Sequence, residues 1–176
     1  MQFIENQTFD ELSIGDSAEL TRKLTPQDIA LFAAMSGDVN PAHGMWGGAL
    51  VSAVLGTELP GPGTIYLSQS MSFLRPVGLG DILTVRVTVA DKKAAHHHVT
   101  FDCLCLNQSG EVVTKGQALI IAPTEKLRRP RVVLPEIQLH ERAARFQDLI
   151  NATKPLSAVP TAVVHPLRRA FAWRRA

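Results

Sequence analysis

The residues best suited to catalysis stand together in one short stretch, Ser36-Gly37-Asp38-Val39-Asn40-Pro41-Ala42-His43-Gly44. A carboxylate and an imidazole held close together can take a proton from water and return a proton to a substrate, which is general acid–base chemistry. Asp38 and His43 are the candidates for these two roles. The alternative is structural, because an Asp that follows a helix often satisfies the amides of a turn.

A helix is predicted to deliver Asp38 to this stretch. Thr25 can cap the first free amides, Pro26 suits the first helical position, and Asp28 favours the positive end of the helix dipole. Gly37 is a typical helix end, so Asp38 is expected just beyond it. The apolar positions that indicate one buried face are Ile29, Leu31, Phe32 and Met35.

A second helix is predicted directly after the catalytic stretch. Pro41 restricts its own backbone and that of Asn40, which favours a stiff turn. Residues 47–57 are apolar on nearly every side, so this helix is expected to be buried all round. The free amides at its N-terminus would point towards the same place as Asp38.

The remaining pattern predicts an antiparallel sheet, and the fold class is α+β. Each strand segment alternates apolar and polar residues or ends at a turn signal, and the segments are 17–24, 64–73, 82–90, 97–106 and 112–121. Four of them follow the buried helix and are expected to form a meander of neighbouring strands. A sheet with one apolar face, curled around the helix, would bury both elements.

Length and charge limit the number of domains and the kinds of partner that this sequence predicts. The 176 residues suffice for one domain, expected at 1–124, and an appendage at 125–176. The first part carries 7 Lys and Arg against 12 Asp and Glu, whereas the second carries 11 against 4. A basic tail with so few aromatic residues among its cations does not favour nucleic acid as a partner. No apolar run is long enough to span a membrane, and the N-terminus lacks the features of a signal peptide, so a cytoplasmic location is expected.

The appendage divides into four parts, of which residues 154–166 are expected to form a proline-punctuated connector. Residues 128–135 are expected to form a linker, and residues 167–176 to be poorly ordered. Between them, residues 138–151 predict one amphipathic helix. Its apolar positions are Leu139, Ala143, Phe146, Leu149 and Ile150.

Two groups of potential metal ligands, a cysteine pair and a histidine triplet, are not expected to bind a metal ion. Cys103 and Cys105 share one face of a strand without a second pair of ligands, so reduced, half-buried thiols are expected. The triplet at 96–98 is expected at a solvated strand start, where the middle ring faces away from its neighbours. No nucleotide-binding fingerprint occurs, because Pro62 lacks the amide that a phosphate would need.

Residues 38–43, the Gly44-Met45 pair and the segment 66–77 together resemble the MaoC-like (R)-specific enoyl-CoA hydratases. The resemblance covers residues 7 to about 122 and implies a hot-dog fold, an acyl-CoA thioester substrate and no cofactor. Segments 123–126 and 161–166 also resemble bifunctional enoyl-CoA hydratase/phosphate acetyltransferase proteins, although residues 167–176 resemble nothing in an acyltransferase. The second enzyme is therefore expected to be absent.

The resemblance also implies roles for individual residues. Asp38 and His43 would hold and activate water, and the amide of Gly44 would stabilise the enolate oxygen. Residues expected to brace the turn or line the substrate pocket are Asn40, Ser68 and Gln69. His43 serves here both as the end of the Asn-Pro-x-His motif and as the start of His-Gly-Met, so the overhanging segment that family members carry between the two is expected to be missing.

Three functions remain open on the sequence. The first is reversible hydration of trans-2-enoyl-CoA to (3R)-hydroxyacyl-CoA. The second is a non-catalytic acyl-CoA-binding or oligomerisation module, which the missing overhang favours. The third is a thioesterase on the same fold, against which Asn40, Pro41 and His43 argue. A homodimer or higher oligomer is expected, because a long edge strand needs covering.

Overall fold

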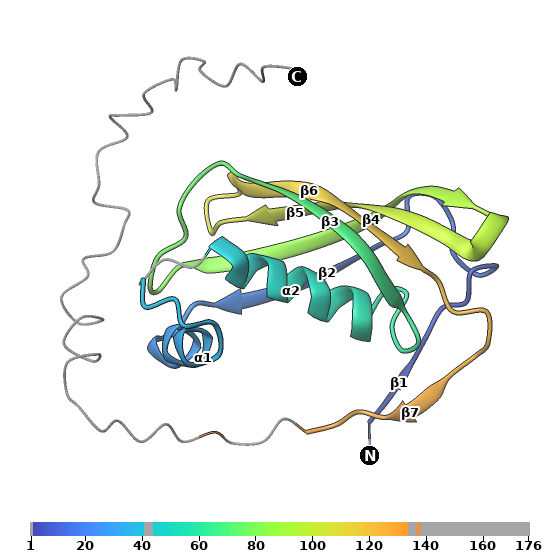
Figure 1. Cartoon of the computed structure of the whole chain (residues 1–176), viewed down its shortest axis with the longest axis horizontal. Coiled ribbons are helices and arrows are strands. Elements are labelled where there is room, and N and C mark those ends of the chain that lie inside the picture. Colours follow the sequence, from blue (N-terminus) through green and yellow to red (C-terminus); the bar gives the residue numbers. More distant parts are fainter. Residues whose placement is uncertain (1, 41–43, 134–136, 138–176) are drawn as a thin grey trace, which may run out of the picture.

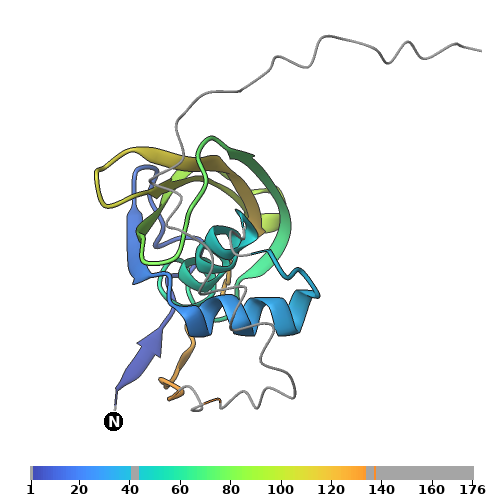
Figure 2. The same cartoon turned by 90° about the vertical axis from the view of Figure 1, so that its left-hand side faces the viewer.

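The computed structural model describes residues 2–40, 44–133 and 137. Its main layer is a five-stranded antiparallel sheet in the order β2-β4-β5-β6-β3. Helix α2 (Gly44–Thr57) lies along the concave face of this sheet (Figure 1), and the view in Figure 2 shows the sheet curling around it. The strands are β2 (Ser17–Lys23), β3 (Ile65–Phe73), β4 (Ile82–Lys93), β5 (His98–Leu106) and β6 (Val112–Ile121). The α+β prediction is confirmed.

Helix α1 (Pro26–Ser36) has the caps that its sequence predicts. The side chain of Thr25 accepts a hydrogen bond from the amide of Asp28, and the Asp28 carboxylate accepts one from the amide of Thr25. Arg22 forms an ion pair with the same buried carboxylate. Gly37 ends the helix with a φ of 76°, a conformation that glycine adopts without strain. These contacts fix where Asp38 leaves the helix.

Helix α2 is buried on one face only, so the prediction of a helix buried all round is wrong. Its buried residues are Trp46, Gly47, Leu50, Val51, Val54 and Leu55. Met45, Ala49 and Ser52 are exposed, because the sheet wraps the opposite side of the helix. The helix also begins at Gly44, three residues earlier than the apolar run indicates.

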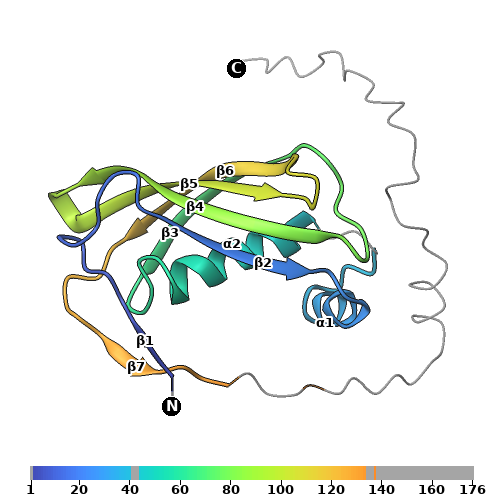
Figure 3. The ribbon, with the colours of Figure 1, turned by 180° about the vertical axis from the view of Figure 1, so that it is seen from behind.

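The order of the strands differs from the expected meander. Strands β4, β5 and β6 do follow one another, and Leu83, Val85, Val87 and Val89 are buried on one face of β4 as predicted. Strand β3, however, pairs with β6 at the far edge instead of with β4 (Figure 3). Alternation of side chains reveals a strand and its buried face, but it carries no information about which strand lies beside it.

Part of the predicted linker forms a second, smaller sheet. Strand β7 (Arg128–Pro130) pairs antiparallel with β1 (Phe3–Glu5). The buried side chain of Asn6 joins the two segments: its amide donates to the carbonyl of Glu125 at 2.9 Å, and its oxygen accepts from the amide of Leu127 at 2.8 Å. The domain division at residue 124 stays a prediction, whereas residues 125–131 lie against the N-terminal strand.

The cysteine and histidine groups take the following places. Cys103 and Cys105 are free thiols, and both are fully buried. Of the histidine triplet, His96 and His97 belong to a short turn, η1 (Ala95–His97), and His98 is the first residue of β5, so the predicted strand start holds for His98 alone. The ring of His97 packs edge-on against Phe9 at 5.2 Å between ring centres, so the three imidazoles do not converge. Among the described residues no group of three potential ligands could hold a metal ion, and no helix is long and apolar enough to cross a membrane.

Candidate active site

Asp38 is held on a compact turn at the end of α1. The Ser36 hydroxyl donates to the carbonyl of Phe32 at 2.6 Å and accepts from the amide of Asp38 at 3.1 Å. The Oδ1 atom of Asp38 accepts two hydrogen bonds from Asn40, from its amide at 3.0 Å and from its side-chain nitrogen at 2.6 Å. Four hydrogen bonds thus hold the turn, and two of them are made to the Asp38 carboxylate.

Asp38 lines a pocket of about 390 Å³ between α1, α2 and β3. The pocket is lined by Phe32, Ser36, Asp38, Gly44, Met45 and Phe73. Its walls are mostly apolar, so Asp38 contributes the one ionisable side chain among these lining residues. An apolar pocket with a single carboxylate suits a substrate that is largely uncharged where it reacts.

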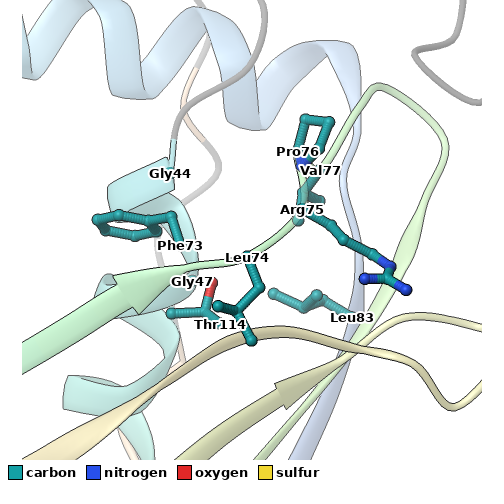
Figure 4. A pocket seen from close by; sticks show the side chains of 9 residues that line it. All are labelled: Gly44, Gly47, Phe73, Leu74, Arg75, Pro76, Val77, Leu83 and Thr114. Carbon is teal, nitrogen blue, oxygen red and sulfur yellow. The ribbon is translucent and has the colours of Figure 1, made fainter. Parts of the chain in front are cut away.

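A second pocket, of about 220 Å³, adjoins Gly44 and Phe73 as well (Figure 4). It is lined by Gly44, Gly47, Phe73, Leu74, Arg75, Pro76, Val77, Leu83 and Thr114. Gly44 and Phe73 line both pockets, so the two pockets are neighbours. A Cβ atom on Gly44 would lie 3.2 Å from the Phe73 ring, so only glycine fits there without displacing the ring.

Gly44 is the first residue of α2, so its backbone amide belongs to the N-terminal end of the helix. The first amides of a helix have no partner within the helix, and the helix dipole makes this end partly positive. Such amides stabilise a negative oxygen that develops during a reaction. The structure therefore brings together a carboxylate at the end of one helix and a set of hydrogen-bond donors at the start of the next.

Ser68 and Gln69 lie apart from these two pockets. Ser68 is exposed on β3 and is absent from the lining of both pockets. Gln69 lies farther along the same strand, where its oxygen accepts from the Tyr66 hydroxyl and its nitrogen donates to the carbonyl of Ser70 at 2.7 Å. Burial raises the pKa of Tyr66 to about 12, so this phenol stays protonated at neutral pH. The structure groups Asp38, Asn40 and Gly44, while Ser68 and Gln69 form a separate group on β3.

Comparison with known proteins identifies the family of this chain. The chain is 39% identical to the (R)-specific enoyl-CoA hydratase of Rhodospirillum rubrum over 132 residues, which cover 91% of that protein and 65% of this chain. This chain belongs to the (R)-specific enoyl-CoA hydratase family. It is also 35% identical over 139 residues to the 3-hydroxybutyryl-CoA dehydratase of Methylorubrum extorquens, covering 88% of that protein and 69% of this chain. A scan of family models found no match.

Solved structures of this hydratase family share the fold. The R-hydratase PhaJ1 of Pseudomonas aeruginosa superposes with a TM-score of 0.76 at 41% identity, over 79% of this chain and all of that one. The (R)-hydratase of Aeromonas caviae gives a TM-score of 0.62 at 33% identity, over 64% of this chain and 98% of that one. The predicted hot-dog fold is confirmed.

The structure describes Phe73 beside Gly44 but does not describe His43. His43 lies outside the described residues, so its predicted role stays a prediction. Phe73 has no role in the sequence prediction, although it lines both pockets. The signal was weak, because Phe73 is 29 residues from Gly44 in the chain and the pairing of β3 with β6 is what brings it to the site.

Proposed function

We propose that this protein catalyses the reversible addition of water to trans-2-enoyl-CoA, giving (3R)-hydroxyacyl-CoA. One observation carries the proposal: in a chain of this family, Asp38 and the amide end of α2 at Gly44 line the same pocket. A hydratase needs a base for water and donors for the thioester oxygen at one place.

In the proposed reaction, water is held between Asp38 and His43. The base takes one proton from this water as its oxygen forms a bond to the β carbon of the substrate, and the electrons of the double bond shift towards the thioester oxygen. The amide of Gly44 donates to that oxygen while it carries negative charge. The proton is then delivered to the α carbon, which restores the thioester, so the step needs no cofactor.

The first test is hydration of crotonyl-CoA by the purified protein, followed as loss of the conjugated-thioester absorbance. The reverse reaction tests the stereochemistry, with (3R)- and (3S)-3-hydroxybutyryl-CoA supplied separately. The proposal expects dehydration of the (3R) compound alone. Equal rates with both isomers, or no conversion of either by a folded protein, would contradict it.

We also propose that this chain lacks most of the overhanging segment of its relatives, and the lengths of the matches support this. The match to the Rhodospirillum rubrum hydratase runs over 132 residues but takes up 65% of 176, which is about 114 residues of this chain. The difference leaves about 18 residues of the relative without a counterpart here. The Methylorubrum extorquens match gives the same difference, since 69% of 176 is about 121 and the match runs over 139.

The same missing segment favours a second candidate function, an acyl-CoA-binding module that does not turn substrate over. Loss of a segment that covers the substrate would let water into the site and weaken the electrostatic effects on which catalysis depends. Calorimetric binding of crotonyl-CoA without any conversion would distinguish this function from hydration.

We further propose that the protein forms a homodimer through the free edge of β3. Among the described residues, strand β3 pairs with β6 on one side only and exposes Ile65, Tyr66 and Leu67. A long edge with exposed apolar side chains favours pairing with a second copy. Sedimentation at several concentrations tests this. The cytoplasmic location and the relation to phosphate acetyltransferases stay predictions from the sequence.

A further inference from the structure

Three polar or charged side chains are buried in the described part of the chain, and they belong to Asn6, Asp28 and Thr114. The side chains of Asn6 and Asp28 form hydrogen bonds with neighbouring segments. Thr114 is only 4% exposed, and its hydroxyl forms no hydrogen bond with any described residue. Burial of a hydroxyl without a partner is unfavourable, so this side chain indicates a place where a polar atom of a ligand binds.

Thr114 lines the pocket of about 220 Å³ that also includes Gly44, and we call it the Thr114 pocket (Figure 4). On the sheet, Thr114 of β6 pairs directly with Phe73 of β3. Leu83 is 1% exposed and Gly47 is buried as well. These two residues and Thr114 are the most deeply buried part of the lining, so they form the floor of the pocket.

The floor offers a ligand a single polar side chain. Of the nine lining residues, Arg75 is the only other one with a polar side chain. Its guanidinium is half-exposed and donates a hydrogen bond to the carboxylate of Glu111 at 3.1 Å. Arg75 is therefore held at the rim, and the Thr114 hydroxyl lies among apolar walls. An apolar pocket with one polar group at its base suits an apolar chain that carries one polar atom.

The Thr114 pocket adjoins the place proposed for the thioester. Gly44 lines both this pocket and the Asp38 pocket, and its amide is the proposed donor to the thioester oxygen. A thioester has two arms, the acyl group and the pantetheine of CoA. The pantetheine arm must return to solvent, and it carries two amides that a single buried hydroxyl cannot satisfy. The acyl group ends within the protein and matches the apolar walls, so it is the arm that fits the Thr114 pocket.

We propose that the Thr114 pocket holds the acyl group of the substrate and that the Thr114 hydroxyl donates a hydrogen bond to an oxygen on that group. The substrate class is then an oxygenated acyl thioester, such as an oxoacyl-CoA, and not a plain hydrocarbon chain. The inference rests on the proposed acyl-CoA substrate and deepens it. A plain chain would leave the hydroxyl unpaired, and a site built to hydrogen-bond an oxygen discriminates against an analogue that lacks it.

Calorimetric binding of saturated thioesters tests the proposal without turnover. The pocket has the volume of about seven water molecules, so the outer carbons of a hexanoyl chain and one oxygen fit. Hexanoyl-CoA is compared with 4-oxohexanoyl-CoA and 5-oxohexanoyl-CoA. We expect the parent protein to bind one of the oxo compounds at least about fivefold more tightly than hexanoyl-CoA. Affinities of both oxo compounds no higher than that of hexanoyl-CoA would overturn the proposal.

Two threonines of the same sheet provide a matched pair of variants. Thr114→Val keeps the branched shape and removes the hydroxyl, so we expect the preference to reverse in favour of hexanoyl-CoA. Thr84 lies on β4, where its hydroxyl is hydrogen-bonded to that of Thr21 at 2.9 Å. Thr84→Val should retain the preference for the oxo compound. If Thr114→Val also retains it, Thr114 does not recognise the acyl oxygen and the proposal is wrong.

Thermal unfolding and hydration complete the experiment. Thr114→Val breaks no hydrogen bond between described residues, so its melting temperature should not fall by more than about 4 °C. A larger fall would show that the hydroxyl has a partner within the protein, which would overturn the proposal. Hydration of crotonyl-CoA without any preference for an oxo compound contradicts this inference alone. A preference without hydration contradicts the hydratase proposal alone, and no binding of any thioester contradicts both.

Discussion

The substitution Asp38→Asn separates a catalytic carboxylate from a structural one. Asn forms the same kind of turn as Asp, because its side-chain oxygen accepts the same hydrogen bonds. The two bonds from Asn40, at 3.0 and 2.6 Å, can both be retained, so the turn and the fold should be unaffected. The substitution removes the negative charge and the ability to accept a proton from water.

The expected magnitude follows from the role. A general base contributes about 100 to 10,000-fold to the rate, which corresponds to about 2.7 to 5.5 kcal/mol of transition-state stabilisation. Asp38→Asn should lower kcat for crotonyl-CoA by this amount with an unchanged melting temperature. Asn40→Ala removes the 2.6 Å bond and keeps the backbone bond, so we expect a smaller loss in kcat/KM, about fivefold for ~1 kcal/mol.

The assay is the loss of conjugated-thioester absorbance, with thermal unfolding measured on the same samples. If kcat of Asp38→Asn stays within about threefold of that of the parent protein, the carboxylate does not act as a base and only holds the turn. If the order is reversed and Asn40→Ala is the more damaging variant, the site depends on the shape of the turn instead of on the Asp38 charge.

Three further predictions concern stability and reactivity. The hydrogen bond from Lys126 lowers the pKa of Glu11 from 4.5 to about 2. The ionised Glu11 therefore stabilises the fold fully above pH 4.5, and this stabilisation is lost as the pH falls towards 2. The difference in melting temperature between the parent protein and Glu11→Gln should shrink over this range. Gly116→Ala would place a Cβ atom 1.8 Å from the backbone oxygen of Ser70. We expect this substitution to lower the free energy of unfolding, measured by urea denaturation, by about 3 kcal/mol. An unchanged midpoint of urea denaturation would contradict the close approach of β3 and β6. Burial raises the pKa of Cys105 to about 11, so this thiol should resist alkylation at pH 8 in the folded protein and react in urea; rapid alkylation without urea would show that the core opens.

The local parts of this structure were predictable from the sequence because their signals are local. The cap at Thr25, the stop at Gly37 and the turn to Asp38 all depend on neighbours within a few positions, and the structure has them where the sequence places them. The same holds for the buried face of β4, since alternation within one strand decides it. The pairing of Asp38 with Gly44 at one pocket also follows, because only five residues separate them.

The features that the sequence did not reveal depend on contacts between distant segments. Strand β3 lies beside β6 and not β4, and this placement brings Phe73 to the site. Strand β7 forms only because β1 lies beside it, and three residues rich in arginine carry no strand pattern of their own. The exposed face of α2 was missed for a related reason. Apolar residues on every side of a helix do not show whether the sheet of the same domain covers all of those sides.

The small β1–β7 sheet has a practical consequence for how this protein can be connected to others. The amide of Arg131 donates to the carbonyl of Gln2 at 2.8 Å, so the start of β1 and the end of β7 lie side by side. A body whose ends meet can be inserted into a surface loop of a host protein without stretching that loop. The same geometry suits circular permutation: a short link from residue 2 to residue 131, with new ends opened at the turn formed by residues 107–110, leaves every strand of the large sheet with its partners.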